Sequence, residues 1–210
     1  IVGNSMAIRV VTDYLEETAN RFPDKTAFVD EIRKITFAEV RDEAYRIAAS
    51  LIGMGLFKKP IVVYLGKRVE CICAFQGVSF SGNFYSPLDT EMPRERIEKI
   101  IDKLKPAAII TDREHSVKAR EFSFNSAVLI YEDLMNVSVD VDKIHAVVDK
   151  IIDTDVLYVL FTSGSTGVPK GAIISHKGII DLTEWIATEL GYNDKSIMAN
   201  QAPFYFSFSV

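Results

Sequence analysis

Hydrophobic residues along the chain follow two alternating spacings. Continuous apolar runs, typical of buried strands, occur at residues 61–65, 107–111, 156–161 and 171–175. Between them, apolar residues recur at helical spacing or fill a mostly apolar helix, at residues 37–51, 69–80, 97–104, 139–152 and 179–190. Strands that alternate with helices predict an α/β fold, in layers of mostly parallel sheet flanked by helices.

Several helix ends carry their own signals. Thr36 and Glu39 have the spacing of a capping box at the start of the first helix, and Gly53 follows its last apolar residues. Pro106 stops the third helix, and Gly191 is suited to a C-terminal cap after the last one. These signals make the helical boundaries more specific than periodicity alone.

Composition narrows the class of protein. The 210 residues are 48% hydrophobic with a net charge of −5 and no basic stripe, so we expect no nucleic-acid partner. No apolar run approaches the ~18 residues of a membrane span, and the N-terminal residues lack a signal-like pattern, so a cytoplasmic location is expected. Cys71 and Cys73 stand two apart in an apolar helix, which points their side chains to different faces and predicts buried thiols without a disulfide.

The segment TSGSTGVPKG, at residues 162–171, follows the apolar run 156–161 directly. Its glycines let the backbone approach an anion, and its amides and hydroxyls supply donors that Lys170 supplements with a positive charge. The predicted phosphate-binding residues are Thr162, Ser163, Gly164, Ser165, Thr166, Gly167 and Lys170. The alternative is an ordinary polar turn, because Gly, Ser and Thr are common in loops.

The segment differs from the phosphate loop of the NTPases. That motif, G-x-x-x-x-G-K-(S/T), places its lysine directly after a glycine at the start of a helix, whereas Pro169 precedes Lys170 here and an apolar run follows. We therefore expect the loop to join two strands, with no helix dipole directed at the phosphates.

The segment resembles the phosphate loop of adenylate-forming enzymes, the superfamily of acyl-CoA synthetases, luciferases and peptide-synthetase adenylation domains. Their pattern (S/T)-S-G-(S/T)-T-G-x-P-K-G is matched at every position. Residues 83–112 and 35–56 are similar to segments of the adenylation domains of nonribosomal peptide synthetases and of D-alanyl carrier-protein ligases. The resemblance implies that residues 1–210 are the N-terminal portion of the large adenylation domain, inactive alone, with the rest of that domain and a small C-terminal domain absent.

The resemblance also implies a reaction. A carboxylic acid of amino-acid type attacks ATP to give an acyl-adenylate and pyrophosphate, and the acyl group then passes to the phosphopantetheine of a carrier protein or to coenzyme A. A carboxylate needs no general base, so catalysis would be positional and electrostatic, with Lys170 as the catalytic residue. Mg²⁺ is implied as a cofactor, with ligands expected largely outside this chain.

Substrate choice departs from the family pattern. The final segment NQAPFYFSFSV resembles the motif F-D-x-S, whose aspartate pairs with the α-ammonium of an amino acid. Phe206, Ser207 and Phe208 align with the motif as substrate-binding residues, and Ser207 stands at the aspartate. Either the substrate lacks an α-ammonium, as for an acyl- or aryl-CoA ligase, or another acid replaces the aspartate. The alternating aromatic residues are also compatible with a core strand.

The remaining polar residues are assigned no chemistry. His176 follows a strand beside Ser175, which can cap the next helix, so we predict a structural role for it. His115 and His145 have no Cys or His partner at metal-ligand spacing, and no metal site is predicted. The charged residues at 31–34 fit a hairpin turn. A phosphohydrolase or kinase and a noncatalytic nucleotide-binding module remain as alternatives to the ligase.

Overall fold

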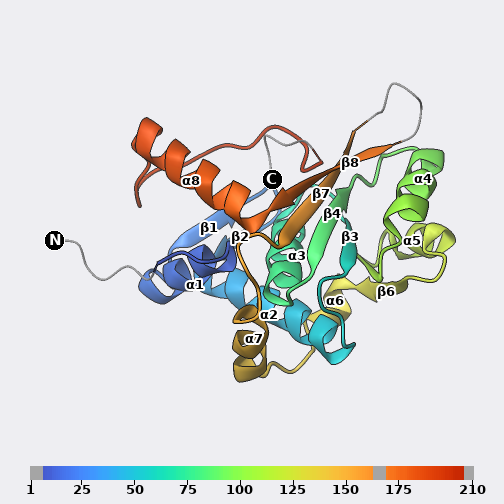
Figure 1. The fold of residues 1–210 in the computed structure, drawn as a ribbon, viewed down its shortest axis with the longest axis horizontal. Coiled ribbons are helices and arrows are strands. Elements are labelled where there is room, and N and C mark those ends of the chain that lie inside the picture. Colours follow the sequence, from blue (N-terminus) through green and yellow to red (C-terminus); the bar gives the residue numbers. More distant parts are fainter. Residues whose placement is uncertain (1–6, 163–168, 206–210) are drawn as a thin grey trace.

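The computed structural model describes residues 7–162 and 169–205, and its centre is a six-stranded sheet (Figure 1). The strands are β3 (Pro60–Tyr64), β4 (Phe84–Leu88), β5 (Ala108–Thr111), β6 (Ala127–Ile130), β7 (Val156–Thr162) and β8 (Lys170–Ser175). Their order is β6-β5-β3-β4-β7-β8, and every neighbouring pair is parallel except the antiparallel pair β7 and β8. A separate antiparallel hairpin joins β1 (Thr26–Val29) to β2 (Lys34–Thr36).

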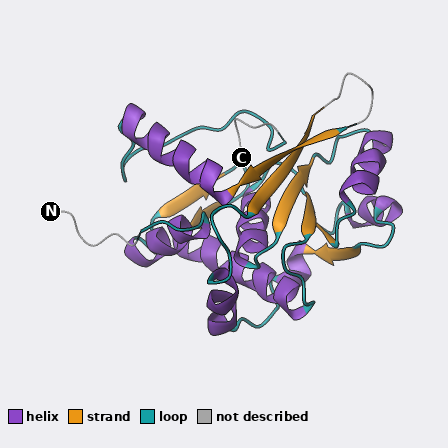
Figure 2. Ribbon diagram, viewed as in Figure 1, coloured by secondary structure: helices purple, strands orange, loops and turns teal. Residues whose placement is uncertain are grey.

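Helices cover both faces of the sheet (Figure 2). The larger hydrophobic cluster lies under α1 (Thr12–Arg21), α2 (Phe37–Gly53), α3 (Val69–Phe80), α6 (Tyr131–Leu134) and α7 (Val141–Val148). The second cluster lies under α4 (Arg94–Leu104) and α5 (Ser116–Phe122). The last helix, α8 (His176–Leu190), follows the edge strand β8.

Strand β3 shows why the central run is apolar throughout. Ile61 and Val63 belong to the larger cluster, whereas Val62 and Tyr64 belong to the second one. Because successive side chains of a strand point to opposite faces, a strand with helices on both sides must be apolar at every position. The sequence-based prediction of a mostly parallel, helix-flanked α/β fold is confirmed.

The predicted caps are confirmed as well. Thr36 and Glu39 form the capping box of α2, Ser175 accepts a hydrogen bond from the Gly178 amide at the start of α8, and Gly191 adopts the left-handed conformation after it. The helix expected over 139–152 is shorter than its apolar pattern. It runs from Val141 to Val148, because the side chain of Asp140 caps its first turn.

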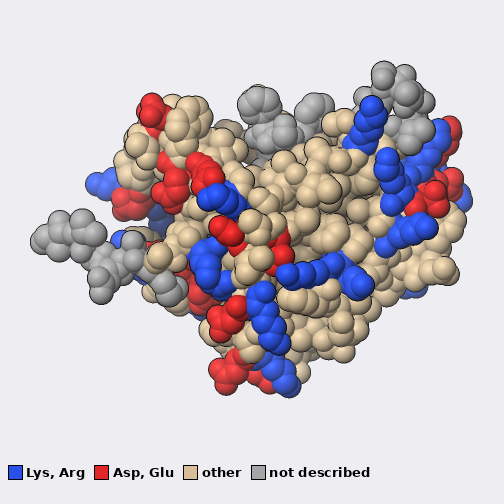
Figure 3. Space-filling view, viewed as in Figure 1, with Lys and Arg blue, Asp and Glu red and all other residues tan. Residues whose placement is uncertain are grey.

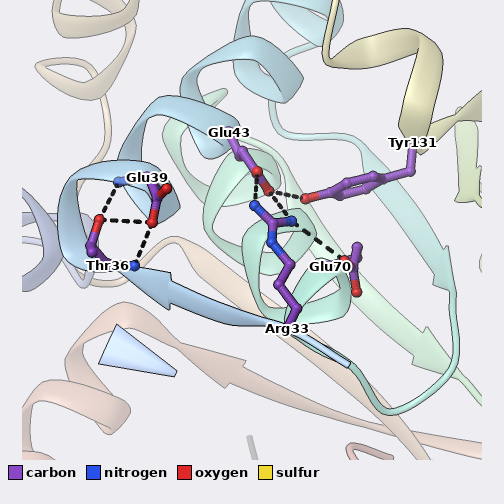
Figure 4. Close-up of polar contacts among 6 residues, drawn as sticks. All are labelled: Arg33, Thr36, Glu39, Glu43, Glu70 and Tyr131. Atoms are coloured by element: carbon purple, nitrogen blue, oxygen red, sulfur yellow. Dashed lines mark hydrogen bonds and ion pairs between the residues drawn. The ribbon is translucent and has the colours of Figure 1, made fainter. Parts of the chain in front are cut away.

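An ion-pair cluster attaches the β1–β2 hairpin to the helices (Figure 4). The guanidinium of Arg33, next to β2, donates two hydrogen bonds to Glu43 of α2 and one of 3.4 Å to Glu70 of α3. The hydroxyl of Tyr131, from α6, donates to the same Glu43 carboxylate. The hydrogen bond from Arg33 to Glu43 raises the pKa of the guanidinium, and burial raises the pKa of Tyr131, so the guanidinium stays charged and the phenol stays neutral.

The turn of the same hairpin caps α3. Asp30 accepts hydrogen bonds from the amides of Ile32 and Arg33 in its own turn, and from the amide of Val69 at 3.0 Å. Arg68, the residue before α3, makes no side-chain cap of its own. Although burial opposes it, these amide donors lower the pKa of Asp30, so its carboxylate remains charged at the positive end of the helix.

His176 confirms the structural role predicted for it. The residue is 1% exposed, and its Nδ1 atom accepts a hydrogen bond of 3.2 Å from the amide of Val11. Burial lowers the pKa of His176 to about 4, despite the neighbouring carboxylates of Asp155 and Asp13. The ring therefore stays neutral at pH 7 and joins the segment before α1 to the start of α8.

Breaking the ion-pair cluster is expected to destabilise the fold. Glu43→Ala should lower the free energy of unfolding by about 3 kcal/mol, the lower end of the range for a broken buried pair, because Arg33 keeps its contact with Glu70. Glu98→Ala, in the exposed pair with Arg94, is the matched control and should cost far less, because solvent screens an exposed ion pair. Urea unfolding of both variants measures the difference, and equal losses would contradict the assignment.

His176 should make stability depend on pH. In the unfolded chain its pKa is near the ordinary 6.5, and in the fold it is about 4, so the unfolded state binds the proton first as the pH falls. Stability should therefore decline by about 3 kcal/mol between pH 6.5 and 4. His176→Gln keeps an acceptor for the Val11 amide without this titration, so urea midpoints of the variant should change less over the window. Parallel pH profiles for the two proteins would refute this role.

Candidate phosphate-binding site

The predicted phosphate loop begins and ends on one antiparallel hairpin. β7 ends at Thr162 and β8 begins at Lys170, and these two residues are partners in the strand register. The expectation that the loop joins two strands is confirmed, and no helix starts at its end. Five of its predicted phosphate-binding residues lie outside the described residues: Ser163, Gly164, Ser165, Thr166 and Gly167.

The two described residues of the site face each other at the base of the loop. The Thr162 hydroxyl donates a hydrogen bond of 3.4 Å to the main-chain carbonyl of Lys170, and both residues are exposed. Thr162 and Lys170 thus bring a hydroxyl and an ammonium group to the base of the loop from opposite strands.

Gly171 is required by the close pairing of these strands. It lies opposite Phe161, and a Cβ atom at this position would come within 2.9 Å of the Cγ1 atom of Val159. That distance is shorter than real Cβ contacts, and Val159 is buried and stiff at χ1. The glycine after Lys170 therefore lets the hairpin close at the base of the loop.

The hairpin places the loop at the edge of the sheet where ligands usually bind. Because β7 is parallel to β4, Thr162 lies toward the carboxyl ends of the parallel strands. In Figure 1 the ends of β7 and β8 that carry the loop lie beside α4. α4 supplies a direct contact, since the Nζ atom of Lys103 donates a hydrogen bond of 3.1 Å to the carbonyl of Pro169, one residue before β8.

Positive charge gathers on this side of the molecule. Figure 3 shows Lys and Arg side chains around the region that α4 occupies, at the upper right. Two of the cations of α4 are neutralised by carboxylates, because Arg94 pairs with Glu98 and Glu121, and Lys99 pairs with Glu95. Lys103 contacts a carbonyl instead, so its charge is less compensated.

The predicted substrate-binding residues Phe206, Ser207 and Phe208 lie outside the described residues. The residues just before them are held against the core. Phe204 contacts the Phe75 ring edge-on with centroids 5.8 Å apart, and Phe75 stacks on Tyr85 at 4.4 Å. The residues before the predicted substrate-binding segment thus lie on an aromatic surface built by α3 and β4.

A cavity of about 400 Å³ lies elsewhere on the carboxyl edge. It is lined by Gly66 and Arg68 after β3, by Asp112 after β5, and by Arg33 and Tyr131 among others. Of the predicted site residues that the structure describes, neither Thr162 nor Lys170 lines it. At the start of α3 beside it, the amide of Val69 is already bonded to the Asp30 carboxylate.

The remaining sequence-based predictions concern the two cysteines, metal sites and membrane spans. Cys71 and Cys73 are buried free thiols, and burial raises the pKa of each. Within residues 7–162 and 169–205, no group of three His, Cys, Asp or Glu side chains could hold a metal ion. Over the same residues, no helix is both long and apolar enough to cross a bilayer.

Sequence reasoning missed Lys103 as a neighbour of the loop, and it missed Lys67. The latter residue follows β3, and its Nζ atom donates a hydrogen bond of 2.6 Å to the carbonyl of Asn200. Lys103 lies within the segment 83–112 and Lys67 lies outside the matched segments, but both contacts join residues more than sixty positions apart. A single sequence holds no signal for such a pairing.

The sequence of the chain is similar to those of curated proteins. A curated relative, tyrocidine synthase 1 of Brevibacillus parabrevis, is 30% identical over 93% of this chain and 18% of its own length. A D-alanine–D-alanyl carrier protein ligase of Lacticaseibacillus casei is 28% identical over 93% of this chain and 38% of its own. The chain thus spans less than two fifths of these relatives.

The fold of the chain is also similar to that of a solved structure. The N-terminal subdomain of Klebsiella oxytoca NpsA, in complex with 3-hydroxyanthranilyl-AMSN, superimposes with a TM-score of 0.75 and 25% identity, covering 94% of this chain and 48% of that one. The family model described as "AMP-binding enzyme" matches residues 15–210, nearly the whole sequence. The chain therefore belongs to the AMP-binding enzyme family.

Proposed function

We propose that residues 1–210 are the N-terminal portion of an adenylation domain that activates a carboxylic acid with ATP. The observation that carries the proposal is the position of TSGSTGVPKG at the turn of the β7–β8 hairpin, toward the carboxyl ends of the parallel strands. Family membership supports the same chemistry. The proposed phosphate contacts come from the loop residues 162–167 and from Lys170.

The proposed reaction is a displacement at phosphorus. A carboxylate oxygen of the substrate forms a bond to the α-phosphorus of ATP, the bond to the bridging oxygen breaks, and pyrophosphate leaves with the electron pair. Since the carboxylate attacks as an anion, no residue has to remove a proton. Amides, hydroxyls and the Lys170 ammonium would stabilise the negative charge on the phosphates.

Mg²⁺ would assist by neutralising phosphate charge, as in other reactions of ATP. Mg²⁺ bound with ATP is usually held by one or two carboxylates together with the phosphates. Among the described residues no group of three His, Cys, Asp or Glu side chains forms a separate metal site. We place its ligands outside the described residues and assign no step to the ion.

The second half of the proposed reaction is transfer of the acyl group to a thiol. The acceptor we favour is the phosphopantetheine of a carrier protein, because a relative is named as a carrier protein ligase. Coenzyme A is the alternative acceptor. A cytoplasmic location stays a prediction.

The substrate we favour follows from Ser207. If Ser207 stands where amino-acid-activating domains have an aspartate, an α-ammonium would lack its partner, at a cost of about 3–5 kcal/mol for an unpaired buried charge. The NpsA subdomain carries a compound with an aryl-acyl group, which supports an acid without an α-ammonium. An amino acid remains the substrate if another carboxylate replaces the aspartate.

Loss of Lys170 is expected to weaken catalysis. In the full-length protein, Lys170→Ala should lower the rate of acid-dependent exchange of labelled pyrophosphate into ATP by about 10²–10³-fold, the scale for one lost oxyanion donor. Lys177→Ala is the control, because this exposed lysine of α8 pairs with Asp181 away from the loop. An unchanged exchange rate in Lys170→Ala would refute the role of Lys170. Acid-independent release of orthophosphate by the unmodified protein would indicate a hydrolase instead.

A panel of acids is expected to separate the two substrate classes. Aryl and hydroxy acids should support pyrophosphate exchange in the full-length protein better than α-amino acids of similar size do, by roughly two decades in kcat/KM. Ser207→Asp should shift the preference toward the amino acid by supplying the missing charge. A strong preference of the unmodified protein for an α-amino acid would contradict the interpretation of Ser207.

A further inference from the structure

Two lysines hold main-chain carbonyls beside the two predicted ligand segments. Lys103 contacts the carbonyl of Pro169, which follows the phosphate-loop residues directly. Lys67 contacts the carbonyl of Asn200, six residues before Phe206. Among the described residues, neither lysine forms an ion pair with a carboxylate, in contrast to Lys99 of the same helix as Lys103.

The contact of Lys103 joins the loop to a firmly packed helix. α4 buries Ile97, Ile100 and Ile101 against the sheet, so its last turn has a fixed position. Leu104, the next residue, packs against the same cluster as Phe161 near the end of β7. The hydrogen bond from Lys103 therefore ties the second leg of the loop to a helix that packs on the same cluster as the end of the first leg.

The contact of Lys67 joins the substrate-binding segment to the opposite layer. Its Nζ atom bonds to Asn200 at 2.6 Å and lies 5.8 Å from the centroid of the Phe204 ring. The Phe204 ring also packs on Phe75 of α3. A cation and an aromatic ring thus hold residues 200–204 by two different interactions.

We propose that Lys103 and Lys67 are positioning residues with separate tasks, Lys103 for the phosphate loop and Lys67 for the acid-binding segment. The proposal rests on the adenylation function proposed above. The division follows from the layers, because α4 packs on one face of the sheet and Phe75 of α3 packs on the other. Neither lysine contacts the reacting atoms in this proposal. Each one fixes the position of a backbone segment, and other residues of that segment contact the ligand.

Steady-state kinetics of the full-length protein should separate the two tasks. Lys103→Met should raise KM for ATP by about three- to tenfold, the effect of one net hydrogen bond, and leave KM for the acid unchanged. Lys67→Met should raise KM for the acid by a similar factor and leave KM for ATP unchanged. Arginine at either position keeps a charged donor and should restore most of the loss. Lys99→Met controls for the loss of a lysine from α4.

A second measurement does not depend on activity. Hydrogen–deuterium exchange of Lys103→Met should increase in peptides covering residues 170–175, and that of Lys67→Met should increase in peptides covering residues 198–205. Thermal midpoints should match the unmodified protein.

The outcomes separate failure of this inference from failure of the proposed function. No acid-dependent pyrophosphate exchange in the unmodified protein would refute the adenylation function, while the deuterium exchange would still test the two contacts. Unchanged deuterium exchange in both variants would overturn the positioning roles whatever the activity. A loss of thermal stability that raises both KM values together would also overturn them, because it would indicate a general structural role.

Discussion

The arrangement of the site depends on the two neighbours of β7. On one side β7 pairs in parallel with β4, and on the other it pairs antiparallel with β8. The parallel pairing directs the end of β7 toward the carboxyl edge of the sheet, and the antiparallel pairing returns the chain at once, so the turn projects from that edge. A helix after β7 would have required a different loop. The absence of the NTPase pattern and the presence of Gly171 opposite Phe161 are two consequences of this one pairing.

The sheet also separates the supports of the site. α4 lies on one face and contacts the base of the phosphate loop through Lys103. α3 lies on the other face, where Phe75 receives Phe204. The start of α3 is itself fixed by Asp30 and Glu70 through the β1–β2 hairpin and Arg33. The stability of this hairpin is therefore coupled to the loop that holds Lys67, since Lys67 lies between the end of β3 and the start of α3.

How much the sequence could predict depended on whether a signal was local. The strand at 61–65, the capping box at Thr36 and the hairpin after Thr162 are properties of neighbouring residues, and all are confirmed. The sequence analysis did not predict α1, α5, α6, β4 or β6. Of these, α5, α6 and β6 are too short to show a clear period of their own. It assigned no function to Arg33, whose partners lie 10 and 37 residues away. The loop motif located the site, but the contacts that hold it required coordinates.

Burial accounts for the pKa shifts of several side chains in the packed interior. Burial raises the pKa of Tyr131, Cys73 and Tyr85, and it lowers the pKa of His176 to about 4. All four side chains are buried in the packed interior, and none belongs to the hairpin that carries the loop. Shifted pKa values often mark catalytic acids and bases, but here they follow from desolvation in the core. A reaction in which a carboxylate attacks ATP needs no such group, so a site of amides, hydroxyls and one lysine at the sheet edge is chemically sufficient for the proposed binding of phosphate.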